Sequence, residues 1–141
     1  ILFTLITFAL TDLISVYCFK EVFERYRPCH NENLNGLLHI INDYCGGKYS
    51  FVSSHAANSF SVLLFLSPKV KTKIPFLWWA LIIWAVLLCY SRIYLGVHYP
   101  IDVLSGAILG SIIGACLHKA VNFAMERFIN NKRKLFQDET V

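Results

Sequence analysis

The sequence predicts an all-α protein built as a multi-pass transmembrane helical bundle. Of its 141 residues, 56% are hydrophobic and 16% are charged, whereas a soluble domain carries about 45–50% apolar and about 25% charged residues. The apolar residues also form four long blocks separated by polar segments. Packing four such helices inside a soluble protein of this size would leave too little polar surface to cover them, so membrane-spanning helices are the better interpretation.

The blocks vary in how well they match the about 17–25 residues that a spanning helix needs. The first block, Ile1–Phe19, and the third, Ile74–Tyr90, meet that length alone. The second block, Phe51–Leu66, and the fourth, Val103–Leu117, need their polar ends in the membrane interface. We therefore expect spans at about 1–19, 52–67, 74–90 and 102–124. Because Ile1 already lies inside an apolar run, we expect the full chain to carry one or more further N-terminal helices.

The basic residues predict the orientation of these spans. The loop 68–73 and the tail 127–141 are rich in lysine and arginine, and such segments stay on the cytoplasmic side. The loops 20–51 and 91–101 then face outside. The net charge of +4 does not form a basic stripe interleaved with aromatic residues, so we expect no nucleic-acid partner.

Small residues and one acid inside the blocks have structural interpretations. Gly106, Gly110 and Gly114 form a row at every fourth position, which lets two membrane helices approach closely. An ionisable residue inside an apolar block is a candidate functional residue. For Asp12 we favour pairing with polar groups of a neighbouring helix.

The predicted topology brings an unusual set of polar residues to one membrane face. Cations beside an apolar bundle are costly unless they meet an anion. The planar guanidinium group of arginine can bind two phosphate oxygens at once, and lysine adds a compact positive charge. The set therefore predicts an anionic, phosphate-bearing ligand. Its members are Lys20, Arg27, Ser53, Ser54, His55, Arg92, His98 and Asp102.

Two histidines extend the prediction from binding to chemistry. Histidine titrates near neutral pH and can act as nucleophile, acid or base. Asp102 follows His98 at i+4, in the first turn of a helix that can start at Pro100, and from there it could orient the His98 ring. A zinc site of His55, His98 and Asp102 is the alternative chemistry. Because three neighbouring cations would repel a metal ion, we expect no metal and no cofactor.

The spacing of these residues resembles the signature of the type 2 phosphatidic acid phosphatase (PAP2) superfamily. That signature is K-x6-R-P, then P-S-G-H, then S-R-x5-H-x3-D. Here it corresponds to Lys20 through Pro28, to Ser53-Ser54-His55, and to Ser91 through Asp102. The middle part departs from the pattern, since Val52 stands for proline and Ser54 for glycine.

The resemblance implies one PAP2-type domain over 1–141, with an acid phosphatase-like fold. It implies that Lys20, Arg27, Ser53, Ser54 and Arg92 bind phosphate, that His98 is the nucleophile oriented by Asp102, and that His55 is the general acid and base. The implied substrate is a lipid phosphate or pyrophosphate such as phosphatidic acid, phosphatidylglycerol phosphate or polyprenyl pyrophosphate. A lipid A phosphatase, or a non-catalytic protein that binds lipid phosphate, is the alternative.

The remaining cysteines and histidines have simpler interpretations. Cys29 and Cys45 share the external loop, where a disulfide can form, and we expect them to be bonded. Cys18, Cys89 and Cys116 act as small apolar residues, while His30, His39 and His118 have no motif partners and are interpreted as structural. Short loops favour a bacterial inner-membrane enzyme with its site on the periplasmic face; the oligomeric state is left open.

Overall fold

A computed structural model describes residues 1–34, 36–38, 40 and 45–138. All of the regular elements in this part of the chain are helical, apart from one isolated bridge between Tyr26 and Tyr49. The elements are α1 (Leu2–Leu13), η1 (Ile14–Lys20), α2 (Glu21–Phe23), η2 (Pro28–His30), η3 (Glu32–Leu34), α3 (Ser54–Lys73), α4 (Pro75–Tyr94) and α5 (Pro100–Asp138). The predicted all-α bundle is confirmed.

The first three elements form one continuous rod from Leu2 to Phe23, in which η1 is a π-helix. Its hydroxyl residues Thr7, Thr11 and Ser15 are buried, while most of its large apolar residues are exposed. Each hydroxyl donates to a carbonyl of its own helix, for example Thr7 to Phe3 at 2.8 Å. Satisfied hydroxyls face the bundle and apolar groups face outward, as a membrane environment requires.

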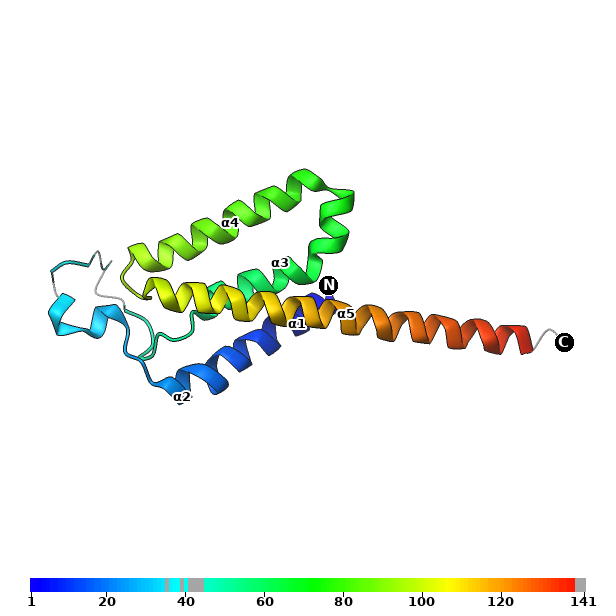
Figure 1. Ribbon diagram of the computed structural model, residues 1–141, viewed down its shortest axis with the longest axis horizontal. Coiled ribbons are helices and arrows are strands. Elements are labelled where there is room, and N and C mark those ends of the chain that lie inside the picture. Colours follow the sequence, from blue (N-terminus) through cyan, green and yellow to red (C-terminus); the bar gives the residue numbers. More distant parts are fainter. Residues whose placement is uncertain (35, 39, 41–44, 139–141) are drawn as a thin grey trace.

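Helix α3 forms the middle of the bundle, since it contacts α1, α4 and α5. Ser53 caps it by accepting a hydrogen bond from the Ala56 amide at 3.5 Å. Figure 1 shows α3 bending before it reaches α4. Pro68 lies inside the helix and cannot donate to the carbonyl of Leu64, which explains the bend.

The segment between α3 and α4 corrects our prediction. We expected a loop at 68–73, but α3 continues through Lys73 and α4 begins at Pro75. Pro68 bends α3 without ending it, and Pro75 starts the next helix because the first helical position needs no amide donor. The connection is therefore only Ile74. Residues 91–94, also expected in a loop, extend α4 by about one turn.

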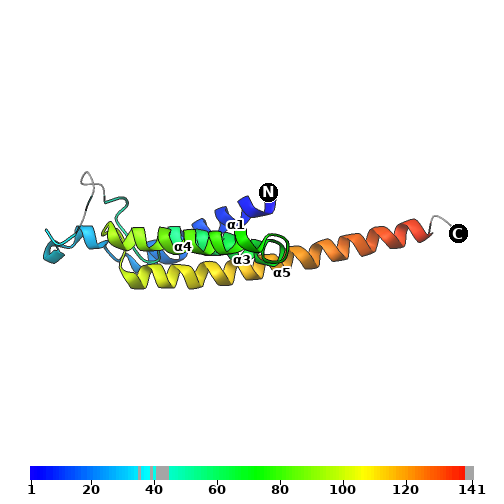
Figure 2. The ribbon, with the colours of Figure 1, turned by 90° about the horizontal axis from the view of Figure 1, so that it is seen from above.

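The predicted glycine row is confirmed as a packing device between α5 and α3. Side chains at Gly106, Gly110 and Gly114 would collide with backbone atoms of Ser53, Ala57 and Ser61 respectively. Glycine is therefore needed at each position for the two helices to lie this close. Beyond the row, α5 projects past the rest of the bundle (Figures 1 and 2).

Among the described residues, helices at Leu2–Phe23, Pro75–Tyr94 and Pro100–Arg133 are long and apolar enough to cross a membrane. Helix α3, which we expected as the second span, does not meet that criterion. Its buried positions are occupied largely by small and polar residues such as Asn58, Ser59 and Ser61. A helix enclosed by three others needs less apolar surface, so a crossing by α3 stays a prediction.

Candidate active site

The predicted site residues come from separate segments that meet at one end of the bundle. Figure 1 shows the end of α2 and the starts of α3 and α5 at the same side as the end of α4. Lys20 ends η1, His55 lies in the first turn of α3, and Arg92 lies in the last turn of α4. His98 occupies the turn before α5, and Asp102 lies in the first turn of that helix.

The charges of these residues act on one another across the segments. His55 lies within electrostatic range of Arg92, His98, Lys20 and Arg27. His98 in turn lies within range of Arg27 and Lys20. The structure therefore brings the predicted histidines and cations into one cluster.

His98 and Asp102 are buried, with exposed fractions of 2% and 0%, whereas His55 is exposed. The Nδ1 atom of His98 lies 3.8 Å from Oδ2 of Asp102, which is beyond hydrogen-bond distance. No other described group pairs with this buried Nδ1. Catalytic hydrogen bonds are often long in an empty site and shorten when substrate binds, so the geometry favours a proton on Nδ1 that faces the carboxylate.

The environment of His98 keeps its ring neutral. Burial lowers the pKa of the imidazole from its ordinary 6.5, and the charges of Arg27 and Lys20 lower that pKa further, while Asp102 opposes them. A neutral ring with its proton on Nδ1 has a free electron pair on Nε2. The arrangement therefore supplies a nucleophilic nitrogen near neutral pH.

Backbone hydrogen bonds fix the position of the His98 turn. The carbonyl of Arg92 accepts from the amides of Val97 and His98, at 3.3 and 3.2 Å. Gly96 has a φ of +63°, a conformation that glycine adopts without strain. On the other side, the Ser53 amide donates to the carbonyl of Asp102 at 3.0 Å. The turn is thus joined to α4, and the first turn of α5 that follows it is joined to the start of α3.

The two serines of the middle motif are already engaged. Ser53 is fully buried and its hydroxyl caps α3. The Ser54 hydroxyl shares a 2.6 Å hydrogen bond with Ser15 of η1. A glycine at position 54 would leave Ser15 without this partner, so the departure from the family pattern has a structural role. Both side chains serve packing, and because the Ser53 amide donates to the Asp102 carbonyl, only the Ser54 backbone amide at the helix start is suited to bind phosphate.

Arg27 is held between the external loop and the His98 turn. Its Nη1 lies 3.5 Å from the carbonyl of Val97. A Cβ at Gly46, which has a φ of +76°, would lie 3.3 Å from the same Nη1. The structure joins Cys29 to Cys45 by a disulfide, with Cα atoms 5.9 Å apart. The bond thus links the residue two positions after Arg27 to the residue before Gly46.

A cavity of about 300 Å³ adjoins the cluster on the side of α3. His55, Asn58 and Ser59 line it together with apolar side chains of α1, α3 and α4. Its other lining residues are Phe8, Val62, Leu63, Leu66, Leu81, Trp84 and Leu88. Apart from His55, Asn58 and Ser59, the lining side chains are apolar, so the cavity suits a hydrocarbon chain.

The model of the PAP2 superfamily matches residues 1–126 of this chain. The chain belongs to the PAP2 superfamily. The family resemblance inferred from the motifs is thereby confirmed, and with it a multi-pass membrane protein.

Several PAP2 proteins of stated activity resemble this chain. It is 36% identical over 127 residues to the lipid A 4'-phosphatase of Porphyromonas gingivalis, covering 89% of this chain and 52% of that protein. It is 38% identical over 112 residues to the lipid A 4'-phosphatase of Bacteroides thetaiotaomicron, covering 77% and 47%. With the undecaprenyl-diphosphatase of Sulfolobus acidocaldarius it shares 46% identity over 97 residues, covering 67% and 42%. The chain thus spans about half the length of the curated relatives it matches.

A solved PAP2 structure has the same fold. The crystal structure of a transmembrane PAP2 type phosphatidylglycerolphosphate phosphatase from Bacillus subtilis matches with a TM-score of 0.67 and 29% identity. The match covers 90% of this chain and 61% of that one.

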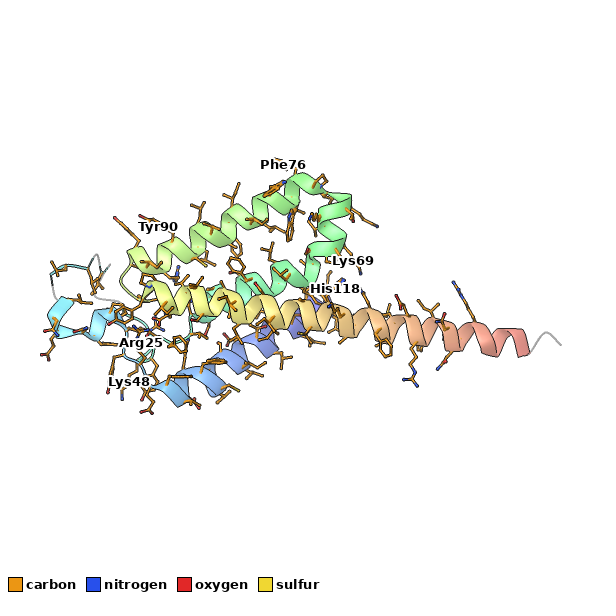
Figure 3. All side chains as sticks on the ribbon, in the orientation of Figure 1. Arg25, Lys48, Lys69, Phe76, Tyr90 and His118 are labelled. Atoms are coloured by element: carbon orange, nitrogen blue, oxygen red, sulfur yellow. A yellow bond between two sulfur atoms is a disulfide. The ribbon has the colours of Figure 1, made fainter. Side chains whose placement is uncertain are left out.

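One residue of this PAP2 site was missed by the sequence analysis. The Nη1 atom of Arg25 lies 2.9 Å from Oδ1 of Asp102, and the guanidinium carbon lies 4.2 Å from the centre of the Tyr99 ring. Figure 3 shows Arg25 at the site end of the bundle. Since alternate residues of an extended segment share a side, the pair Arg25 and Arg27 was a usable signal.

The other polar residues singled out in the sequence have structural partners. Asn58 donates to Oδ1 of Asp12 at 3.0 Å, which confirms that Asp12 pairs with a neighbouring helix. His118 joins α5 to α3 through the Phe65 carbonyl at 2.9 Å and also contacts Asn122. His39 lies outside the described residues.

The alternative zinc site finds no support in the arrangement of ligand atoms. Among the residues that the structure describes, His55, His98 and Asp102 do not form a group with converging ligand atoms, whereas Cys29, His30 and Cys45 do. The two sulfur atoms of that second group are bonded to each other. His30 is then the group's one remaining ligand.

Proposed function

We propose that this PAP2 protein is an integral membrane phosphatase that hydrolyses the phosphate ester or pyrophosphate of a lipid through a phosphohistidine. The observation that carries the proposal is the His98 site. A buried, neutral imidazole has a carboxylate on its Nδ1 side, and arginine and lysine charges surround the cluster. This combination can hold a phosphate and attack it, since cations stabilise the charge of the transferring group.

The reaction follows from the roles of the individual residues. Lys20, Arg27 and Arg92 bind the phosphate oxygens. The Nε2 atom of His98 attacks phosphorus, the bond from phosphorus to the lipid oxygen breaks, and His55 gives that oxygen a proton. His55 then takes a proton from water, whose oxygen attacks phosphorus and breaks its bond to His98. Phosphate is released, and both histidines return to their starting states.

The apolar cavity beside His55 supports a lipid as the substrate. A soluble phosphate ester would gain nothing from the apolar walls, whereas burial of a chain contributes about 0.8 kcal/mol per methylene. Identities of 36% and 38% to lipid A 4'-phosphatases favour a phosphorylated glycolipid of the lipid A type. The 46% identity to an undecaprenyl-diphosphatase makes a polyprenyl pyrophosphate the second candidate. A non-catalytic role is disfavoured because both histidines are present.

We further infer a bacterial inner-membrane location with the site on the periplasmic face. Lys69 lies at the far end of α3 from Arg25 (Figure 3), and basic residues favour the cytoplasmic side. The disulfide at the site end suits an oxidising compartment. Topology reporters fused to the ends of α3 and α4 would place the two faces.

A lipid panel tests the proposed function. The protein, purified in detergent, is incubated with lipid A, phosphatidic acid, phosphatidylglycerol phosphate and undecaprenyl pyrophosphate, and released phosphate is measured. We expect release from lipid A to be fastest. His98→Ala serves as the matched control for contaminating phosphatases. If the protein releases no more phosphate than His98→Ala from any of the four lipids, the proposal is contradicted.

A further inference from the structure

Resting on the proposed function, we propose that Arg25 is a positioning residue for the nucleophile. It holds the carboxylate of Asp102 so that one oxygen faces His98. Arg25 itself need not touch the phosphate. In this arrangement the reacting histidine is supported by a carboxylate, and that carboxylate is supported by an arginine on another segment of the chain.

The two oxygens of Asp102 have different partners. Oδ1 accepts from Nη1 of Arg25 at 2.9 Å. Oδ2 accepts from the amide of Tyr99 at 2.8 Å and lies nearest to Nδ1 of His98, at 3.8 Å. With Oδ1 bound, rotation of the carboxylate is restricted, so Oδ2 stays directed at His98.

The burial of Asp102 makes this contact important. The Asp102 side chain is 0% exposed, while that of Arg25 is 40% exposed. A buried carboxylate that loses its cation is left with an uncompensated charge, which is strongly unfavourable. Arg25 reaches in from the surface and supplies that charge without becoming buried itself.

Tyr99 fixes the arginine in turn. The guanidinium carbon of Arg25 lies 4.2 Å from the centre of the Tyr99 ring, close enough for a cation–π interaction. Because the Tyr99 amide also bonds Oδ2 of Asp102, residue 99 holds both members of the ion pair. Lysine could supply the charge but could not stack in the same way.

This assignment separates Arg25 from the phosphate-binding cations. A group that holds phosphate contributes to substrate binding, so its loss raises KM in addition to any fall in kcat from the lost stabilisation of the transferring charge. A group that positions Asp102 acts on the chemical step, so its loss lowers kcat and leaves KM nearly unchanged. Loss of the residue that orients a metal-ligating side chain typically costs about 10- to 100-fold in activity, and we expect a loss of similar size for Arg25, which orients Asp102.

The test compares Arg25→Gln, Arg25→Lys and Asp102→Asn with the double variant Arg25→Gln/Asp102→Asn, using lipid phosphate release. Lys48→Gln is the matched control, because Lys48 is a nearby cation that stacks on Tyr26 and Tyr49 instead. We expect kcat of Arg25→Gln to fall about 10- to 100-fold with KM unchanged, and Arg25→Lys to recover part of the loss. In the Asp102→Asn background, Arg25→Gln should cost little more, since both changes remove the same interaction.

Other outcomes would overturn the assignment. If Arg25→Gln mainly raises KM, Arg25 is a phosphate ligand. If Arg25→Gln lowers the kcat of Asp102→Asn as much as it lowers that of the unmodified protein, Arg25 does not act through Asp102. Should Arg25→Gln not fold, as judged by gel filtration in detergent, Arg25→Lys and Tyr99→Leu keep the charge and test the same kcat effect. Inactivity of the unmodified protein would refute the proposed function, whereas an active protein with unchanged Arg25 variants would refute the role of Arg25 alone.

Discussion

The carbonyl of Arg92 accepts a hydrogen bond from the amide of His98 at 3.2 Å. This contact joins the last turn of α4 to the turn that carries His98, the proposed nucleophile. It explains why the arginine and the histidine of the third motif are separated by five residues, because that length allows the chain to leave α4 and return to the Arg92 carbonyl. The proposed phosphate-binding cation Arg92 and the proposed nucleophile His98 are therefore positioned by one piece of backbone.

The two histidines should fail differently when they are replaced. We expect His98→Ala to lose all turnover and any trapped phosphoenzyme, because the bond to phosphorus cannot form. His55→Ala should lose lipid turnover, but a nitrophenyl phosphate, whose leaving group needs no proton, should restore its phosphorylation step. General acid catalysis contributes about 10²–10⁴-fold, so the restoration is measurable by rapid-quench phosphate transfer. Equal restoration of both variants would reverse the assigned roles.

As the pH is lowered, activity should fall with a midpoint below pH 6.5, which is the ordinary pKa of histidine. His98 attacks as the neutral ring, and burial lowers its pKa, so protonation removes the nucleophile only at a pH below that of free imidazole. Because Arg27 also lowers this pKa, the Arg27→Gln variant should have a higher His98 pKa. The acid limb of its profile of kcat/KM against pH should therefore lie at higher pH. Substrate ionisation is the same for both proteins, so an unmoved limb would show that His98 does not define it.

Chelation should leave the activity intact. The proposed reaction uses histidine, carboxylate and cationic side chains, and none of its steps needs a metal. Phosphate release with and without EDTA should agree, and vanadate, which mimics the transferring phosphoryl group, should inhibit. Loss of activity on chelation, with recovery on adding zinc, would favour the zinc alternative.

Cys29 and Cys45 should be recovered as one cross-linked peptide pair. The structure bonds them beside Arg27, so we also expect Cys29→Ser and Cys45→Ser to raise KM by similar amounts, and the double variant to add nothing more. Mass spectrometry of peptides prepared without reductant checks the bond. Cys116→Ser is the control, since Cys116 is a free, exposed cysteine. Two alkylatable thiols at positions 29 and 45 would contradict this prediction.

Gly110→Ala should destabilise the protein, although alanine favours helices by about 1 kcal/mol over glycine. A methyl group at Gly110 would collide with the backbone at Ala57, and overpacking costs about 1–3 kcal/mol. Thermal unfolding in detergent should therefore occur at a lower temperature. Ile108→Ala, at an exposed position of the same helix, should change the melting point less, and an equal or smaller effect at Gly110 would refute the close contact.

The sequence was sufficient to predict the helices and the convergence of the motifs, because apolar blocks and motif spacing are local signals. It was insufficient for the pairing of Arg25 with Asp102. The alternation of Arg25 with Arg27 indicates that the two share a side, but the direction of that side also depends on the backbone at Glu24. That residue has a φ of +46°, and a glutamate gives no local indication of such a conformation. The helical segment 68–73 was missed because proline and lysine are typical of loops, while tertiary packing decides whether a helix continues through them.

The π-helical stretch Ile14–Lys20 determines which way Lys20 faces. Residues five apart in an α-helix are separated by about 140° around the axis, which would put Lys20 well away from the face that carries Ser15. In a π-helix the backbone bonds join residues five apart, so those two residues stand above one another. The wider backbone thus lets a single face of the first rod carry both its packing contact with α3 and its charge for the site, and the angular placement of that charge is set by the main chain.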